Sequence, residues 1–201
     1  MKKKNNIKKD RNLFYSLSKF ILKIPFILYY RPTIIGKEKI PKEGPIIFVG
    51  NHIHLFDQCL PILATNRIIH YMAKKEYFTN WKVSWFFKLA GCISVDRKTN
   101  DQKAAHSALN VLKKGYALGI FPEGTRNRTN EILLPFKKGA VSMAQKTGAT
   151  IVPFIVTGKY ERKGNLTCTF LNPITVKKDE DITKANNNLR QLMIDNLKKH
   201  A

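Results

Sequence analysis

Two histidines and one carboxylate lie close together in one short segment of the chain: His52, His54 and Asp57. A carboxylate that holds one ring nitrogen of a histidine leaves the other nitrogen to take a proton from a hydroxyl group. His52 and Asp57 are five positions apart, about 140° of rotation on an ideal helix, so they meet only if His52 lies on a turn before the helix. His54 is three positions from Asp57 and suits a pair on one helical face, so it is the alternative base.

A second polar cluster has the residue types of an anion site: Glu123, Gly124, Thr125 and Arg126. Arginine presents a planar fork that matches a phosphate group, and a glycine lets the backbone approach a ligand closely. Glu123 is expected to accept a hydrogen bond from a sugar or glycerol hydroxyl, or to orient Arg126. Arg97 follows another apolar run and is expected to add a second cation; the alternative for it is a solvated surface charge.

Motifs for a protein nucleophile or a nucleotide site are absent from the sequence. The chain contains no G-x-S-x-G, no G-x-G-x-x-G and no G-x-x-x-x-G-K-[ST]. A base without its own nucleophile activates a group on the substrate. Beside an anion site, this favours a hydroxyl on a phosphorylated small molecule as the group that loses its proton.

Two other interpretations of the histidine segment are open. A metal-dependent hydrolase motif H-x-H-x-D-H would place a histidine directly after the carboxylate, where this chain has Gln58, so we expect no metal site. In a purely structural interpretation, the segment is a capped turn with a satisfied histidine. Cys59, Cys92 and Cys168 form no C-x-x-C pair, which predicts a reduced, cytoplasmic protein without disulfides or structural zinc.

The composition is that of a folded protein with an unusual charge. The 201 residues suffice for one α/β domain with appendages, and 43% of them are apolar and 25% charged, which excludes a wholly disordered chain. Lysines and arginines number 36 against 14 aspartates and glutamates, a net charge of +22. We therefore expect an anionic partner: nucleic acid, a membrane surface or a phosphorylated substrate.

The apolar pattern alternates short strand-like runs with longer helical stretches. Strands are expected at 46–49, 68–72, 93–95, 118–121, 151–156 and 166–170, and helices at 55–65, 76–89, 102–114, 138–147 and 183–199. This alternation predicts an α/β fold with a mainly parallel sheet flanked by helices. Ligands of such sheets bind at the carboxyl ends of the strands. The polar segments that begin at Asn51, Asp96 and Pro122 each follow a predicted strand, so we expect them to converge on one crevice.

The first 31 residues differ from the rest of the chain. Residues 1–11 are mostly Lys and Asn and predict a mobile basic tail. Residues 13–30 are strongly apolar, but Lys19 and Lys23 interrupt the run and Pro25 is expected to kink a helix, so we expect no membrane-spanning helix. The apolar side chains fall on one helical stripe and the lysines on the other side. This pattern is typical of a helix in a membrane interface, with its basic residues toward the headgroups; the alternative is a core helix docked on its own domain.

Four segments, in order, resemble the blocks of the bacterial 1-acylglycerol-3-phosphate acyltransferase (lysophosphatidic acid acyltransferase) family. They are 51–57, 91–97, 121–126 and 151–154, and the similarity covers 32–173. The H-x-x-x-x-D pair of the first block is His52 and Asp57, and its spacing assigns the base to His52. The chain departs from the family at His54, where a small polar residue is usual, and at Asn127, where serine often follows the third block.

The resemblance implies an acyltransferase domain at 32–201, after a basic tail and amphipathic membrane-contacting segment at 1–31. Such enzymes move a fatty acyl group from acyl-CoA or acyl-carrier protein to the free hydroxyl of 1-acylglycerol-3-phosphate, giving phosphatidic acid. His52 would be the general base and Asp57 its partner. The glycerol phosphate would be held by Arg97, Glu123, Gly124, Thr125 and Arg126. Pro153 and its apolar neighbours would shape the acyl side.

The resemblance also implies partners and a place in the cell. It implies no metal and no cofactor, with the acyl donor as co-substrate, and contact with lysophosphatidic acid and an anionic membrane surface rather than nucleic acid. The expected location is the cytoplasmic face of the cell membrane, peripheral or monotopic. The alternatives are another glycerolipid acceptor, a metal-dependent hydrolase, and a non-enzymatic nucleic-acid-binding module that the positive charge would suit.

Overall fold

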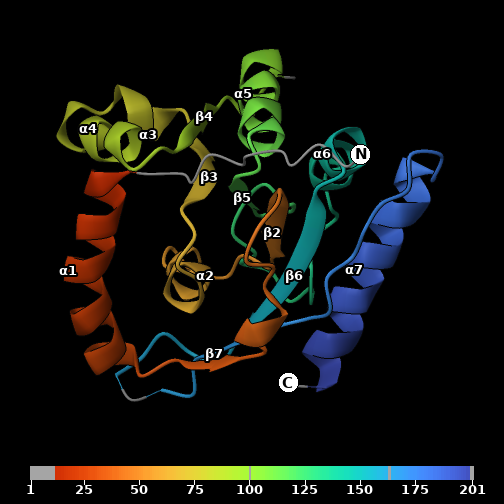
Figure 1. Cartoon of the computed structure of the whole chain (residues 1–201). Coiled ribbons are helices and arrows are strands. Elements are labelled where there is room, and N and C mark those ends of the chain that lie inside the picture. The colour runs from red at the N-terminus through yellow and green to blue at the C-terminus, as the bar shows by residue number, and fades with distance from the viewer. Residues whose placement is uncertain (1–11, 100, 163, 200–201) are drawn as a thin grey trace.

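The structure is a computed structural model that describes residues 12–99, 101–162 and 164–199. The expected basic tail at 1–11 lies outside the described residues. In the described part of the chain, seven strands form one sheet in the order β1-β7-β6-β2-β5-β3-β4 (Figure 1). The strands are β1 (Thr33–Ile35), β2 (Ile46–Gly50), β3 (Ile69–Lys74), β4 (Ile93–Val95), β5 (Ala117–Ile120), β6 (Thr150–Thr157) and β7 (Thr167–Phe170).

The sheet is mainly parallel, as the sequence predicts. The central strand β2 pairs in parallel with β5 on one side and β6 on the other. β3 and β4 continue in the same direction, whereas β7 runs antiparallel to β6 and parallel to β1. β2 and most of β6 are buried, because helices cover both faces of the sheet.

The helices form a layer on each face of the sheet. They are α1 (Leu13–Tyr30), α2 (Cys59–Ala64), α3 (Glu76–Thr79), α4 (Trp81–Leu89), α5 (Gln102–Lys113), α6 (Gly139–Thr147) and α7 (Ile182–Lys199). One core lies under α5, α6 and α7 and contains Ile47 and Val49 of β2. The other core contains Phe48 of β2 and Leu60 of α2, and Phe26 of α1 packs against it. In Figure 1, α1 and α2 accordingly stand on one side of the sheet and α7 on the other.

Two α-helices, one strand and one 3₁₀ helix differ from the expectation. The helix expected at 55–65 begins only at Cys59, because the residues before it are folded into turns around a buried carboxylate. The helix expected at 76–89 is divided into α3 and α4 at Asn80, whose side chain accepts a hydrogen bond from the Lys82 amide and starts α4. Strand β1 and the 3₁₀ helix η1 (Lys37–Lys39) were not expected, since three residues show too little periodicity.

Helix α1 is one helix that runs through Pro25, and within it only Tyr15 is buried. The predicted apolar stripe is open, with more than half of each side chain exposed: Leu13, Leu17, Phe20, Ile21, Ile24 and Leu28. Lys19 and Lys23, on the other side, line a pocket against the rest of the protein. α1 is therefore not a core helix. By length and composition it would pass as a membrane span, a criterion that core helices and signal sequences meet too.

Candidate active site

The turn that contains the histidines begins at the carboxyl end of β2 and is anchored to β6. At Gly50 an added Cβ atom would lie 2.1 Å from Cζ of Phe154, so only glycine fits at the end of this strand. Beyond Gly50, the side chain of Asn51 forms the hydrogen bonds with the backbone of β6. Its Nδ2 donates to the Val156 carbonyl at 2.9 Å, and its Oδ1 accepts from the Val156 amide at 2.7 Å. The start of the turn is thus fixed relative to the sheet.

The carboxylate of Asp57 is fully buried and organises this turn. Its Oδ2 accepts three hydrogen bonds, from Nδ1 of His52 at 2.7 Å, the Ile53 amide at 2.7 Å and the His54 amide at 2.8 Å. Because Asp57 accepts, Nδ1 of His52 has the hydrogen, and Nε2 is left with a lone pair. The predicted contact between His52 and Asp57 is therefore present, with His52 on the turn before α2. The alternative pairing of the His54 ring with Asp57 is wrong.

The other oxygen of Asp57 is held from a distant part of the chain. Oδ1 accepts a hydrogen bond from the hydroxyl of Tyr160 at 2.7 Å. Burial, and then the charge of Asp57, raise the pKa of Tyr160 well above its usual range. The tyrosine therefore stays a hydroxyl donor at any pH at which the protein works.

The first and third polar clusters meet at the backbone of His52. Its amide donates to Oε1 of Glu123 at 2.8 Å, and its carbonyl accepts from the Asn127 amide at 2.6 Å. The imidazole stacks on Phe121, with the ring centroids 4.2 Å apart and the planes 15° apart. The segment after β5 thus holds both the backbone and the ring of the histidine.

The carboxylate of Glu123 is used inside the protein. Oε1 accepts from His52 and Oε2 from the Leu134 amide at 2.9 Å, and the residue is buried. Burial raises the pKa of Glu123, and the two backbone donors oppose that change. Glu123 is not among the described residues that line the pocket between α1, α2, β3 and α4. In this structure its carboxylate instead connects two loops. Its predicted contact with the acceptor stays a prediction.

Gly124 has a backbone conformation that glycine favours, with φ of 73°. An added Cβ atom would lie 3.0 Å from Cε of Lys137. The side chain of Lys137 therefore covers the glycine at the place where the sequence predicts a close approach by ligand. Like Glu123, Gly124 is not among the described residues that line the pocket.

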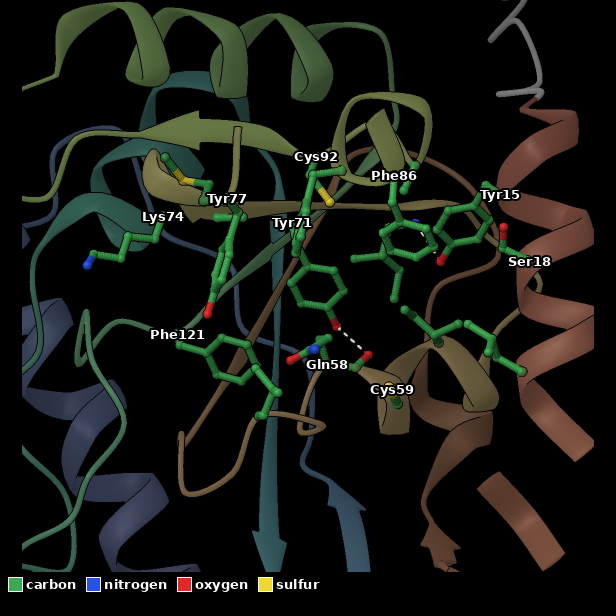
Figure 2. A pocket seen from close by; sticks show the side chains of 18 of the residues that line it. Tyr15, Ser18, Gln58, Cys59, Tyr71, Lys74, Tyr77, Phe86, Cys92 and Phe121 are labelled. Carbon is green, nitrogen blue, oxygen red and sulfur yellow. Dashed lines mark hydrogen bonds between the residues drawn. The ribbon is translucent and has the colours of Figure 1, made fainter. Parts of the chain in front are cut away.

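A pocket of about 480 Å³ lies between α1, α2, β3 and α4. Most of its wall is apolar or aromatic. Figure 2 shows Lys74 and Phe121 on one side, Tyr15 and Ser18 of α1 on the other, and Tyr71 between them. His52, Arg97, Thr125 and Arg126 also line it. The structure thus brings together at least one member of each predicted cluster, as expected from the sheet topology.

Five cationic side chains line this pocket: Lys19 and Lys23 of α1 on one side, and Lys74, Arg97 and Arg126 elsewhere in its wall. Lys74 forms an ion pair with Glu76 at 3.0 Å. Neither guanidinium has a hydrogen bond or ion pair with another described residue, so both are free to take an anionic ligand. The side chain of Arg97 is exposed, as a solvated surface charge would be, and it also lines the pocket.

Cysteines form part of the pocket wall and are not activated. Cys59 and Cys92 line it, and Cys168 is buried nearby in β7. Burial raises the pKa of Cys59 to about 12 and that of Cys92 to about 11. All three thiols are free and stay protonated near neutral pH, so a nucleophilic role is disfavoured.

Sequence reasoning missed two residues and misplaced a third. Lys74 ends β3 at the same edge of the sheet as the other clusters, a position that was available as a signal. Tyr160 follows β6 in a loop with no motif, and no signal in the sequence pointed to it. Pro153 does not line the pocket in the described structure: it is buried in β6 and pairs with Val49.

In the described residues, no group of three or more His, Cys, Asp and Glu side chains is placed to hold a metal ion.

The family model described as "Acyltransferase" matches residues 31–157, and the chain belongs to this family. The resemblance seen in the sequence is thereby confirmed.

Relatives with assigned names are similar over most of that region. The chain is 37% identical over 122 residues to the 1-acyl-sn-glycerol-3-phosphate acyltransferase of Borreliella burgdorferi, an alignment that covers 60% of this chain and 48% of that protein. It is 33% identical to the Bacillus subtilis protein of the same name, over 68% of each chain. The chain thus spans about half the length of the first relative and two thirds of the second.

A solved structure has the same fold. The crystal structure of the 1-acyl-sn-glycerophosphate (LPA) acyltransferase PlsC from Thermotoga maritima superposes with a TM-score of 0.77. The superposition covers 92% of this chain and 78% of that chain, at 24% sequence identity. This likeness establishes the α/β architecture of the described chain.

Proposed function

We propose that this chain transfers a fatty acyl group from a thioester to the free hydroxyl of 1-acylglycerol-3-phosphate, giving phosphatidic acid. One observation supports this most directly: the His52–Asp57 pair stands at a pocket that has both an apolar wall and two unpaired guanidinium groups. An acceptor with an acyl chain, a hydroxyl and a phosphate matches all three features. The names of the curated relatives support the same acceptor.

The chemistry follows from the position of the hydrogen on His52. Nε2 of His52 accepts the proton of the acceptor hydroxyl as that oxygen attacks the thioester carbonyl carbon. Asp57 stabilises the imidazolium that forms and keeps the ring oriented through Nδ1. When the tetrahedral intermediate collapses, the C–S bond breaks and the leaving thiolate takes the proton from Nε2. The ester and the free thiol are the products, and His52 is neutral again.

The acceptor phosphate is assigned to the cationic side of the pocket. Arg97 and Arg126 come from different loops, so together they can contact two sides of a phosphate, and each offers two parallel N–H donors. Lys74 adds a point charge that is partly neutralised by Glu76. The apolar and aromatic part of the wall is the place for the acyl chain. Glu123 supports this arrangement by accepting a hydrogen bond from the amide of His52. Gly124 supports it by its positive φ in the loop before Arg126.

The membrane surface is assigned to α1 and α4. Both helices are free of acidic residues, and α4 exposes 79% of Trp81 and 54% of Trp85. The rings of Phe14 in α1 and Trp85 in α4 are in contact, with centroids 5.9 Å apart, so the two apolar surfaces are continuous. Tryptophan and lysine side by side suit the boundary between acyl chains and anionic headgroups. We assign the chain to the cytoplasmic face of the cell membrane, as a peripheral or monotopic protein.

The acyl donor is either acyl-CoA or acyl-carrier protein. Both are anionic, and the net charge of +22 favours the approach of either one. The same charge suited a nucleic-acid-binding module, but membership of the acyltransferase family and the histidine–aspartate pair favour the enzyme. A different glycerolipid acceptor is the closest alternative within the family.

The experiment that tests the proposal is a direct assay of product. The purified full chain is incubated with labelled 1-acylglycerol-3-phosphate and acyl-CoA or acyl-carrier protein, with His52→Ala as the matched control. We expect labelled phosphatidic acid with at least one donor and none above background with the control. Acylation only of glycerol-3-phosphate or another lysophospholipid would reassign the acceptor. No acyl transfer at all, with a salt-sensitive shift of RNA or DNA, would favour the binding module.

A further inference from the structure

We propose that Tyr160 is a positioning residue for the catalytic pair: its hydroxyl holds Oδ1 of Asp57 so that Oδ2 is the oxygen that orients His52. The proposal rests on the proposed function for its kinetic readouts. Tyr160 lies outside all four segments that resemble the family blocks. It lies in the loop between β6 and β7.

The hydrogen bonds of Asp57 divide unequally between its two oxygens. Oδ2 has three donors from its own turn. Oδ1 has one donor in the described structure, the hydroxyl of Tyr160 at 2.7 Å. Since the carboxylate is fully buried, water does not replace that donor. Without Tyr160, Oδ1 would be a buried charged oxygen without a partner, which is unfavourable and draws neighbouring donors toward it.

His54 fixes the ring of Tyr160. The two rings are stacked, with centroids 4.1 Å apart and planes 22° apart. The amide of His54 donates to Oδ2 of Asp57, and its Nδ1 accepts from the Phe56 amide at 3.3 Å. His54 therefore contacts the carboxylate through its backbone and the tyrosine through its ring. This gives a structural task to the histidine that departs from the family pattern.

Helix α1 contacts the same tyrosine. The ring of Tyr30, at the end of α1, meets Tyr160 edge-on, with centroids 5.5 Å apart. Phe56 contacts both Tyr30 and His54. The hydroxyl of Tyr160 is thus directed at Asp57 by a cluster of rings from three segments of the chain.

The hydrogen bond from Tyr160 also changes the electrostatic effect of Asp57 on the base, His52. Asp57 faces these titratable groups: His52, His54, Tyr160, Cys59, Cys168 and Glu123. The cysteines are neutral, so the strong interactions are with His52 and Tyr160. A hydroxyl that donates to the carboxylate reduces the pull of that carboxylate on the imidazolium. Removing the hydroxyl leaves more of the charge of Asp57 to act on the imidazolium.

The test is Tyr160→Phe in the full chain, assayed for phosphatidic acid across pH. We expect kcat to fall about ten- to hundredfold, the effect of losing a hydrogen bond to a charged group, with the KM for the acceptor unchanged. The acid limb of the pH–rate profile should move to higher pH. Tyr116→Phe is the matched control, because Tyr116 stands before β5 outside the pocket and should leave both quantities unchanged. A variant with the wild-type kcat and pH profile, or with only KM altered, would overturn the proposal.

A second variant keeps the test valid if Tyr160→Phe folds poorly. Site-specific fluorotyrosine at position 160 retains the shape and makes the hydroxyl a stronger donor, so the acid limb should move to lower pH. A pH profile unchanged by this probe would contradict the proposal.

A third readout needs no activity, so failure of the proposed function does not affect it. The Nδ1 proton of His52, shared with Asp57 at 2.7 Å, should give a downfield proton resonance that His52→Ala removes. In Tyr160→Phe this resonance should move or disappear, and in Tyr116→Phe it should stay. The same resonance in all the tyrosine variants would show that Tyr160 does not act on the pair.

Discussion

The amide of His52 donates to Oε1 of Glu123 at 2.8 Å, although the two residues are 71 positions apart. Glu123 also accepts from the Leu134 amide, so one buried carboxylate connects the turn after β2 to the long segment after β5. The imidazole of His52 rests on Phe121 at the start of that segment. The position of the base therefore depends on the loop that also contains Arg126, and the two halves of the site cannot move independently.

His52→Ala should abolish turnover and leave the fold intact. A positioned general base contributes roughly 100- to 10,000-fold to the rate, and the side chain of His52 lies at the pocket rather than in a core. His54→Ala should lose far less activity, because it removes a ring that stacks on Tyr160 but no base. Steady-state rates together with thermal unfolding of both variants check this. If His54→Ala were the inactive variant, the base would have been assigned to the wrong histidine.

Arg126→Ala should raise the KM for the phosphorylated acceptor more than the KM for the thioester. Its guanidinium lines the pocket and has no partner among the described residues, so its donors are free for phosphate. Arg126→Lys should recover only part of the loss, since an ammonium group cannot form the two parallel hydrogen bonds. Acceptor and donor kinetics are measured separately for each variant. An unchanged acceptor KM with altered donor kinetics would move this arginine to the donor side.

Glu123 should contribute less to stability as the pH rises. Burial raises the pKa of Glu123 above its ordinary value of 4.5, so the folded state binds this proton more tightly than the unfolded state. The stability that this proton contributes is present below the ordinary pKa and is lost as the pH rises through the raised pKa.

Glu123→Gln cannot titrate and provides the comparison. The free energy of unfolding of the wild-type chain, minus that of Glu123→Gln, should decrease between about pH 4 and pH 7. Urea unfolding of both proteins across this range measures the difference. A difference that increases with pH would mean that the His52 and Leu134 amides favour the charged form by more than burial opposes it.

The sequence predicted those contacts of the site that depend on the spacing of residues along the chain and on the ends of the strands. The contact of His52 with Asp57 could be predicted because five positions and a strand end constrain it, and the edge of the sheet predicted that Arg97 and Arg126 would reach one pocket. The tasks of Glu123 and Tyr160 could not be predicted in this way. They depend on which backbone groups the segments after β5 and β6 bring to the turn, and no spacing in the sequence encodes that.

Helix α1 illustrates the same limit. Its periodicity predicted an apolar stripe and a basic side, and the exposed stripe is present. The side that faces the protein could not be predicted, because it depends on what α1 packs against. Lys19 and Lys23 line the pocket, and Tyr15 and Phe26 reach the wall of the same pocket. A truncation that begins at Pro32 would therefore open the pocket as well as remove the stripe, so substitutions in the full chain test membrane binding more cleanly.

Binding to anionic vesicles should require both α1 and α4. Phe20→Ser with Ile24→Ser removes exposed apolar surface from α1, and Trp81→Ala with Trp85→Ala removes it from α4. Each pair should weaken binding to vesicles of phosphatidylglycerol and phosphatidylcholine, and the two pairs combined should abolish most of it. Rising salt should weaken wild-type binding without abolishing it, because salt screens the lysines but not the apolar contact. Ile35→Thr, at an exposed position on β1, is the control and should bind as the wild type does. Co-sedimentation measures all five proteins, and undiminished binding by the combined variant would place the attachment surface elsewhere on the molecule.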